Sequence, residues 1–222
     1  MAGNQAYDEP LRFGVALFPG FQALDVFGPL DCINVLSRTD SHRLSLSILS
    51  STLEPVTTKP PGFPDAIGQS VVPTHTFATA PPLDVLFVPG GRGTRGSSSV
   101  VQELIAFIKT TYPQLKYLIT VCTGSGLAAR AGVLDGKRAT TNKMAWREIT
   151  AWRPQVIWVP RARWVTDGNI WTSSGVSAGI DVTLAWIEEV FGMQTAKKIA
   201  DGIEYTRHED PSLDPFAGLH GL

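Results

Sequence analysis

The sequence predicts an α/β fold in which helices flank a mainly parallel sheet. Continuous apolar runs typical of buried strands occur at residues 12–18, 83–88 and 117–121. Each run ends at a turn and is followed by apolar residues at helical spacing, and strands that alternate with helices in this way pair in parallel. Ligands bind beyond the carboxyl ends of such strands. We therefore expect a functional site where the loops after these three runs converge.

Length and composition indicate a single domain spanning residues 1–222, with irregular tails at 1–11 and 206–222. A chain of 222 residues, 43% of them hydrophobic, can bury one sizeable core. The formal net charge of -1 and the pI near 6.4 disfavour a nucleic acid or an anionic membrane as partner. The two cysteines, Cys32 and Cys122, are too few for a disulfide framework, and the amino terminus does not resemble a targeting signal. We expect a cytoplasmic protein.

The amino-terminal half is expected to open with the strand at 12–18 and a helix over 21–36. Pro29 fits best in the first turn of that helix, where its missing N–H costs nothing. Asp25 would then lie just ahead of the helix, at the carboxyl edge of the first strand. The next predicted elements are an alternating strand at 43–49, a small hairpin excursion within 54–79, the strand at 83–88 and an amphipathic helix over 100–112 that preceding serines cap.

The carboxyl-terminal half begins with the buried strand at 117–121, which passes through Cys-Thr-Gly into a helix of small residues. Further on, two short strands are joined across Asp167-Gly168-Asn169 as a hairpin. The elements predicted after the first strand are a helix over 126–130, a turn over 131–137, an extended piece at 138–141, a helix over 143–152, strands at 156–159, 163–166 and 170–173, and helices over 180–191 and 194–205.

The turn at Cys122 has the pattern of a nucleophile elbow. A sharp strand-to-helix turn pushes one side chain out at the carboxyl end of the sheet, and here that side chain is a thiol. The following helix would place positive charge near the sulfur, so we expect the pKa of the thiol to fall. The alternative is a small buried core cysteine. The Thr-Gly-Ser-Gly segment behind Cys122 favours the functional interpretation, because it allows backbone to approach a substrate closely.

Five motifs together resemble the ThiJ/PfpI superfamily, and within it the isonitrile hydratase branch, whose domain also occurs fused to AraC-type regulators. Their order and spacing agree with that family from Arg12 to Phe191. The resemblance implies a flavodoxin-like three-layer sandwich of the class I glutamine-amidotransferase kind, and a homodimer. The motifs are Phe-Pro-Gly at 18–20 with Leu-Asp-Val-Phe-Gly-Pro at 24–29, Phe-Val-Pro-Gly-Gly at 87–91, Val-Cys-Thr-Gly at 121–124, Gly-Lys-Arg-Ala-Thr-Thr at 136–141, and the run from Thr172 to Asp181.

The same resemblance implies catalytic roles for Cys122, Asp25 and Thr123. Cys122 matches the family nucleophile, and Asp25 matches the acidic residue that reaches the sulfur from the first strand–helix loop. A carboxyl beside a thiolate should have a raised pKa, so a protonated Asp25 would donate to the sulfur. The backbone N–H groups of Thr123 and Gly91 would form an oxyanion hole, and the Thr123 hydroxyl would reach Asp25 or the sulfur. The alternatives are helix caps at Asp25 and Thr123.

The remaining candidates are expected to bind the substrate or its developing charge: Gly90, Gly91, Gly124, Asn142 and Trp146. Asn142 stands where many superfamily members carry a histidine, which disfavours chemistry based on a cysteine–histidine pair. Trp146 is our first choice among the tryptophans for a wall of an apolar pocket, although most of the tryptophans fit packing roles. We expect no metal and no cofactor, and we interpret all the histidines as structural or solvent-facing: His42, His75, His208 and His220.

The leading functional hypothesis is a cofactor-free hydratase that acts on a small molecule. The resemblance implies that Cys122 attacks an isocyanide, and that water then releases an N-substituted formamide from the thioimidate. One alternative keeps the cysteine–acid pair for another lyase, dehydratase, cyclase or glyoxalase-like step on a small metabolite. A second alternative is a redox-sensing or protein-quality-control protein in which Cys122 is an oxidisable thiol of low pKa.

Overall fold

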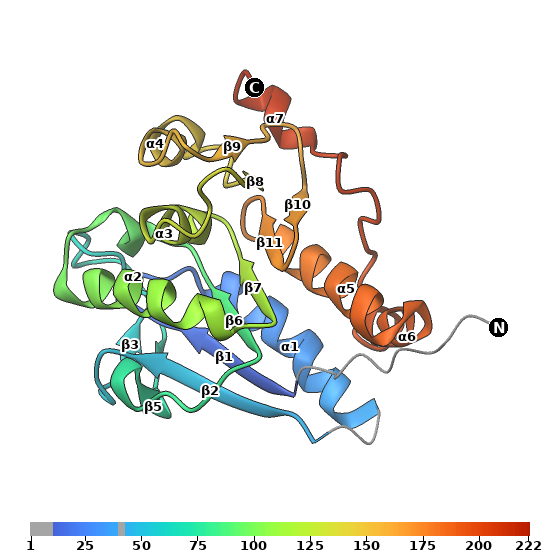
Figure 1. Ribbon diagram of the computed structural model, residues 1–222, viewed down its shortest axis with the longest axis horizontal. Helices are drawn as coiled ribbons and strands as arrows, with labels where there is room; N and C mark the ends of the chain where they lie inside the picture. Colours follow the sequence, from blue (N-terminus) through green and yellow to red (C-terminus); the bar gives the residue numbers. More distant parts are fainter. Residues whose placement is uncertain (1–10, 40–42) are drawn as a thin grey trace.

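A seven-stranded sheet organises the computed structural model, which describes residues 11–39 and 43–222 (Figure 1). The strand order is β10-β11-β7-β6-β1-β2-β5, and every neighbouring pair is parallel except β10 with β11. The predicted α/β fold with a mainly parallel sheet is therefore confirmed. The strands are β1 (Arg12–Ala16), β2 (Ser45–Ser50), β5 (His75–Thr76), β6 (Val85–Val88), β7 (Tyr117–Thr120), β10 (Trp164–Asp167) and β11 (Ile170–Ser173).

Helices cover both faces of this sheet and give three layers (Figure 1). On one face, α1 (Ala23–Thr39), α5 (Ala178–Phe191) and α6 (Met193–Gly202) pack against one another. On the other face, α2 (Ser99–Thr111) packs against α3 (Gly124–Arg130), and the side chain of Ser98 caps α2. The strands are buried on both faces because their sequences are continuously apolar, which is typical of a parallel sheet.

The core between the sheet and α5 is built around Trp186. Its ring lies edge-on to Phe13 of β1 and Tyr117 of β7, at centroid distances of 5.8 and 5.5 Å. Trp186 is fully buried, and such edge-to-face contacts are favourable for aromatic rings. Packing at this point holds α5 against the same strands that carry the site.

The segment 54–79 forms the predicted hairpin and also one strand that the sequence did not indicate. Its hairpin consists of β3 (Val56–Thr57) paired antiparallel with β4 (Ser70–Val71). Residues 75–76 then form β5, which joins the edge of the main sheet beside β2 and leads into η1 (Phe77–Thr79). Two residues are too short a strand for an alternating pattern to reveal.

A separate two-stranded sheet packs next to β10. There β8 (Arg138–Ala139) pairs in parallel with β9 (Ile157–Trp158), and α4 (Trp146–Ala151) lies between them in the chain. The short helices η2 (Arg92–Arg95) and η3 (Tyr112–Gln114) complete the connections. The segment predicted as a helix from residue 143 begins its helix only at Trp146, because residues 143–145 form a turn.

Two expectations about α1 are wrong. The helix begins at Ala23, so Asp25 lies inside its first turn instead of ahead of it, and Pro29 lies in the helix interior. The backbone N–H of Asp25 donates to the carbonyl of Gln22, which starts the helix earlier than the proline signal suggested. Pro29 lacks the N–H that would otherwise bond to the carbonyl of Asp25, and α1 continues through this single missing bond.

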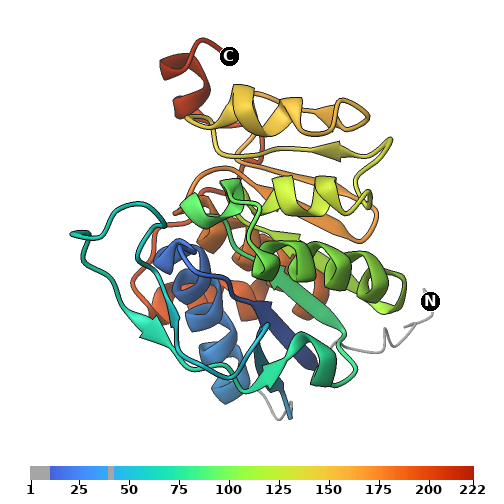
Figure 2. The same cartoon turned by 90° about the vertical axis from the view of Figure 1, so that its left-hand side faces the viewer.

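The carboxyl-terminal tail differs from its prediction in part: residues 206–214 are irregular as expected, but a helix follows them. Residues 206–222 run back along the molecule and end in α7 (Pro215–Leu219), beside β8, β9 and α4 in both views (Figures 1 and 2). The backbone N–H of His208 donates to Asp181, and the N–H of Arg163 donates to the carbonyl of Pro211. Of the amino-terminal tail expected at 1–11, residues 1–10 lie outside the described part of the chain.

Candidate active site

Cys122 occupies a strained turn between β7 and α3. Its φ is 58°, in the left-handed region that residues other than glycine seldom adopt. Its backbone N–H donates to the carbonyl of Ser174, 3.0 Å away, so the loop after β11 holds the turn in place. At Gly124 a Cβ atom would lie 2.2 Å from the carbonyl oxygen of Val88, which restricts that position to glycine. The geometry is that of a nucleophile elbow.

Three hydrogen-bond donors converge on the sulfur of Cys122. They are the backbone N–H groups of Val176 and Thr123 and the side-chain amide of Asn142. These donors lower the pKa of the thiol, but desolvation and the charge of Asp25 outweigh them, and the pKa rises to about 12. The expectation of a depressed thiol pKa is therefore wrong. Only 5% of Cys122 is exposed, and burial of this degree cannot be read from the sequence around the elbow.

Asp25 lies against Cys122 and is almost completely buried. Its Oδ2 accepts the backbone N–H of Gly90 at 2.8 Å, whereas Oδ1 is buried without a hydrogen-bond partner among the described residues, and the Cys122 thiol lies near enough to the carboxyl to lower its pKa. Burial raises the pKa of Asp25 to about 7, and the contacts with Gly90 and Cys122 oppose that rise. The direction agrees with the sequence-based expectation, whereas the main cause is desolvation and not the neighbouring thiolate. Its contacts with Gly90 and Cys122 do not fit the alternative role of a helix cap.

Asp25 and Cys122 form a coupled pair that loses its protons in two steps. The first step lies near pH 7, and the second is displaced to high pH, mainly because burial disfavours the thiolate and also because the adjacent charge of Asp25 repels it. Between the two steps the pair holds one proton and one negative charge. Such a pair can present a nucleophile and a proton donor to the same substrate atom.

The Thr123 hydroxyl has structural partners that the sequence did not predict. It accepts the backbone N–H of Gly91 at 3.0 Å and contacts the hydroxyl of Thr94 at 3.1 Å. The N–H of Gly91 is thus directed at Thr123 and not at a substrate, so the expected oxyanion hole from Thr123 and Gly91 is wrong in its second member. Thr123 makes no side-chain cap on α3 either. The N–H of Gly90 is likewise taken, by Asp25.

Asn142 is held in one orientation beside the sulfur. Its Oδ1 accepts the backbone N–H of Ala145 at 3.0 Å, which leaves its Nδ2 to face Cys122. A Cβ atom at Gly175 would lie 2.5 Å from that nitrogen, so glycine makes room for the amide. Val176 follows with a φ of 43°, which is rare for a β-branched residue. Sequence reasoning did not single out Gly175 or Val176, although both lie in the quoted 172–181 motif.

Trp146 takes a packing position instead of lining the space beside Cys122. Its ring lies edge-on to Trp158 at 6.2 Å, and the amine of Lys143 lies 5.1 Å from its centroid. A pocket of about 180 Å³ adjoins the sulfur's donors, and Trp146 does not contribute to it. Its lining residues come from three separate segments of the chain: Asn142, Lys143, Met144, Ser174, Gly175, Val176, Ser177, Phe216 and His220.

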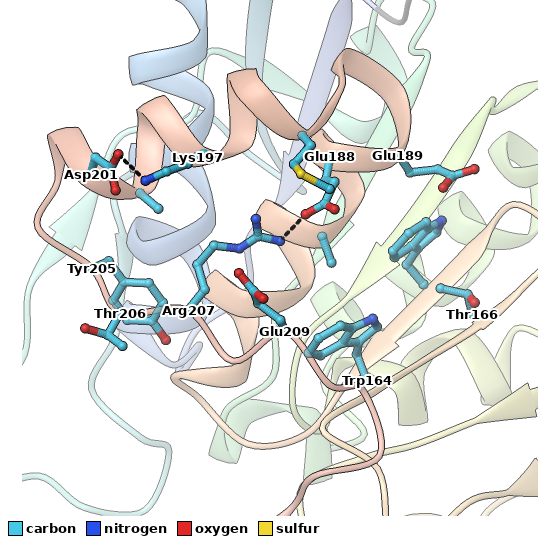
Figure 3. Close-up of a pocket in the computed structure, with 14 residues that line it drawn as sticks. Trp164, Thr166, Glu188, Glu189, Lys197, Asp201, Tyr205, Thr206, Arg207 and Glu209 are labelled. Carbon is cyan, nitrogen blue, oxygen red and sulfur yellow. Dashed lines mark hydrogen bonds and ion pairs between the residues drawn. The ribbon is translucent and has the colours of Figure 1, made fainter.

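A second pocket, of about 880 Å³, lies along α6 and the carboxyl-terminal half of α5 (Figure 3). Its charged side chains largely pair among themselves, as the bonds from Arg207 to Glu188 and from Lys197 to Asp201 show. None of its residues contributes to the Cys122 turn or its donors. The small pocket is therefore the better candidate site, because Asn142 and Val176, two of the groups that face the Cys122 sulfur, line it.

In residues 11–39 and 43–222, no three His, Cys, Asp or Glu side chains gather closely enough to hold a metal ion. No helix of the same ranges has the length and apolar character needed to cross a bilayer. Of the histidines, His42 lies outside the described residues, His208 and His220 are exposed, and His75 is half-buried beside the Thr74 hydroxyl.

The chain is similar in sequence to several known proteins. The chain is 36% identical over 195 residues to isonitrile hydratase from Pseudomonas putida, covering 88% of this chain and 78% of that protein. It is 32% identical over 142 residues to the HTH-type transcriptional regulator GbdR from Pseudomonas aeruginosa, covering 63% of this chain and 37% of the regulator.

Among solved structures, a ThiJ/PfpI family protein from Pseudomonas syringae superposes with a TM-score of 0.76 and is 30% identical. The superposition covers 94% of this chain and 82% of that one. The model of the DJ-1/PfpI family matches residues 12–189, which include the Cys122 elbow and every residue that donates to its sulfur. The chain therefore belongs to the DJ-1/PfpI family.

Proposed function

We propose that this protein is an enzyme that hydrates an isocyanide to an N-substituted formamide. The observation that carries the proposal is the buried contact between Asp25 and Cys122, in a family member whose relatives include an isonitrile hydratase at 36% identity. An isocyanide has a terminal carbon that accepts both a nucleophile and a proton. The one-proton state of the pair supplies both groups at one place.

In the first step, the Cys122 sulfur bonds to the terminal carbon of R–N≡C. Asp25 gives its proton to the same carbon, which yields the thioimidate R–N=CH–S and leaves the carboxylate. Burial raises the pKa of the thiol to about 12 and that of Asp25 to about 7, so the one proton of the pair lies mainly on sulfur and passes to Asp25 as the sulfur attacks. The pair carries one negative charge before and after this step.

In the second step, Asp25 acts as a general base. Water adds to the thioimidate carbon, one water proton reaches the nitrogen by way of the carboxyl group, and R–NH–CH(OH)–S forms. The C–S bond then breaks, the hydroxyl proton passes to Asp25, and R–NH–CHO leaves. The donors from Val176, Thr123 and Asn142 receive the departing thiolate and stabilise its charge.

The test is to incubate the purified protein with a small alkyl isocyanide and follow formamide by NMR. We expect turnover by the wild type and by Cys32→Ala, a control at the other cysteine, and none above background by Cys122→Ala. Mass spectrometry of an acid-quenched reaction should detect the thioimidate on Cys122. A folded wild-type protein that forms no formamide, or a Cys122→Ala variant that matches it, would remove this reaction.

The redox-sensing alternative has less support. A sensor thiol is solvent-accessible and has a low pKa, whereas Cys122 is 5% exposed and burial raises the pKa of its thiol. The homodimer implied by the resemblance stays a prediction, which light scattering on the purified protein would measure.

A further inference from the structure

The carboxyl-terminal segment is anchored beside the candidate site by one buried carboxylate, Asp214. Its Oδ2 lies 3.2 Å from the amine of Lys143 and accepts the hydroxyl of Ser174 at 3.1 Å. Its Oδ1 accepts the backbone N–H of Phe216 at 2.9 Å and so caps α7. The Asp214 side chain is fully buried and that of Lys143 is 2% exposed. A polar anchor this well enclosed fixes the position of α7 on the rest of the protein.

Lys143 is held as firmly as its partner. Its amine donates to the hydroxyl of Thr140 at 2.6 Å and to the carbonyl of Ala162 at 2.9 Å, in addition to Asp214. A buried ammonium group is tolerated only when oxygen atoms surround it in this way. The ion pair is therefore part of a satisfied network and not a loose surface contact.

Asp214 connects α7 to both loops that hold Cys122. Lys143 directly follows Asn142, whose amide donates to the Cys122 sulfur. Ser174 accepts the Cys122 backbone N–H through its carbonyl and lies two residues before Val176, another donor to the sulfur. One carboxylate thus joins the last helix to the two loops that orient the nucleophile.

The same helix supplies one wall of the pocket beside the sulfur. Phe216 lies in α7 and His220 directly follows it, and both line the pocket of about 180 Å³ opposite residues of the two loops. That volume is below the range of about 300 to 1,000 Å³ usual for drug-sized ligands. The match to the family model ends at residue 189, so this wall comes from a part of the chain that the model does not cover.

We propose that α7 is the specificity wall of this enzyme: Phe216 limits the size of the group on the isocyanide nitrogen, and Asp214 is the positioning residue that holds the wall in place. The inference rests on the proposed function for the identity of the substrate. Its physical content does not depend on that reaction: α7 bounds a small pocket that is also lined by Asn142 and Val176, two groups that face the Cys122 sulfur. The favoured substrates are isocyanides with compact, largely apolar substituents.

A substrate series tests the wall directly. Wild type, Phe216→Ala and Leu219→Ala are compared on methyl, tert-butyl and cyclohexyl isocyanide. Leu219 is the matched control, because it lies in the same helix, is 76% exposed and does not line the pocket. We expect Phe216→Ala to lower KM for the cyclohexyl compound about tenfold relative to KM for the methyl compound, and Leu219→Ala to leave that ratio unchanged. Unchanged size discrimination in Phe216→Ala would overturn the proposal.

Asp214→Asn tests the positioning role without altering the lining of the pocket. We expect the same loss of size discrimination as in Phe216→Ala, seen mainly in KM. Because breaking a buried ion pair also weakens the fold, the variant is assayed at temperatures where circular dichroism shows it to be folded. A folded Asp214→Asn protein with wild-type discrimination would contradict the role of Asp214.

Thiol alkylation separates this inference from the reaction itself. Compact iodoacetamide and bulky pyrenyl maleimide are compared, and peptide mapping distinguishes Cys122 from the fully buried Cys32. We expect Phe216→Ala to increase the rate of alkylation of Cys122 by the maleimide about tenfold more than the rate of alkylation by iodoacetamide. Leu219→Ala should change neither rate. This result without isocyanide turnover would support the wall and refute the proposed function. Isocyanide turnover, together with equal effects of Phe216→Ala on the maleimide and iodoacetamide rates, would support the proposed function and refute the wall.

Discussion

The backbone N–H of Val176 donates a hydrogen bond to the sulfur of Cys122, and both residues hold positive φ angles, 43° and 58°. Each such conformation costs about 1 to 3 kcal/mol in a residue other than glycine. The two strained turns come from different loops and meet at one atom. Favourable interactions elsewhere in the fold must offset this strain. The two turns together direct the N–H of Val176 toward the sulfur, where it would stabilise a thiolate.

Gly175→Ala should disturb this arrangement through Asn142. The new Cβ would lie 2.5 Å from the Asn142 amide nitrogen, so the amide must move away from the sulfur. We expect kcat/KM for isocyanide hydration to fall by about 10² to 10³, as for loss of one oxyanion-hole donor. The kcat/KM of Asn142→Ala should fall by a similar factor. Gly202→Ala is the control, because nothing lies within 4 Å of a Cβ there. If Gly175→Ala and Asn142→Ala were both as active as Gly202→Ala, the Asn142 donor would be dispensable.

Thr123→Val should lower stability more than it lowers the reactivity of Cys122. Valine keeps the shape and the backbone N–H that faces the sulfur, but it removes the hydroxyl that pairs with the N–H of Gly91. A buried donor left without a partner costs about 1 to 3 kcal/mol, which urea unfolding would measure. Thr123→Ser keeps the hydroxyl and should lose less. If Thr123→Val instead retained its stability and lost turnover, the hydroxyl would have a direct role in catalysis.

The fold was predictable because its strands are continuous apolar runs that alternate with helical segments. The convergence of the loops after β1, β6 and β7 follows from the parallel sheet, so Asp25, Gly90 and Cys122 were placed together correctly. The turn at Cys122 could be recognised because glycines in the sequence permit close approach of the backbone. At Gly124, an added Cβ atom would lie 2.2 Å from the carbonyl oxygen of Val88.

The features that the sequence did not reveal depend on contacts between distant residues. The pKa of the Cys122 thiol is set by burial, which the whole fold determines. The N–H of Gly91 was assigned to a substrate, but the Thr123 hydroxyl competes for it. The order of the carboxyl-terminal tail depends on Asp214 reaching Lys143, 71 positions earlier in the chain. No local pattern around residue 214 predicts such a pair.

Asp25→Asn should change the pH dependence of stability. Burial raises the pKa of Asp25 from its ordinary value of 3.8 to about 7, so between these pH values the folded state binds more protons than the unfolded state. The free energy of unfolding therefore falls as pH rises, by about 1.4 kcal/mol per unit and about 4 kcal/mol in all. Asparagine keeps an acceptor for the Gly90 N–H but does not titrate.

Urea unfolding of wild type and Asp25→Asn at pH 4 and pH 8 measures this effect. The free energy of unfolding of Asp25→Asn minus that of wild type should be about 4 kcal/mol larger at pH 8 than at pH 4. The raised pKa of Cys122 does not contribute, because that thiol is protonated in both states below pH 8. A difference that stays constant across this range would mean that Asp25 titrates normally in the folded protein.

Alkylation of Cys122 should show an inflection near pH 7 that depends on Asp25. The first ionisation of the pair leaves its negative charge mainly on Asp25, whose pKa is about 7, and the carboxylate can then accept the thiol proton as the sulfur attacks iodoacetamide. In Asp25→Asn no second group takes the proton, and burial holds the thiol protonated to higher pH. Iodoacetamide rates from pH 5 to pH 10, with peptide mapping of Cys122, distinguish the two profiles. Identical profiles for the two proteins would show that Asp25 and Cys122 ionise independently, and a proton passed between them would then have no part in the reaction.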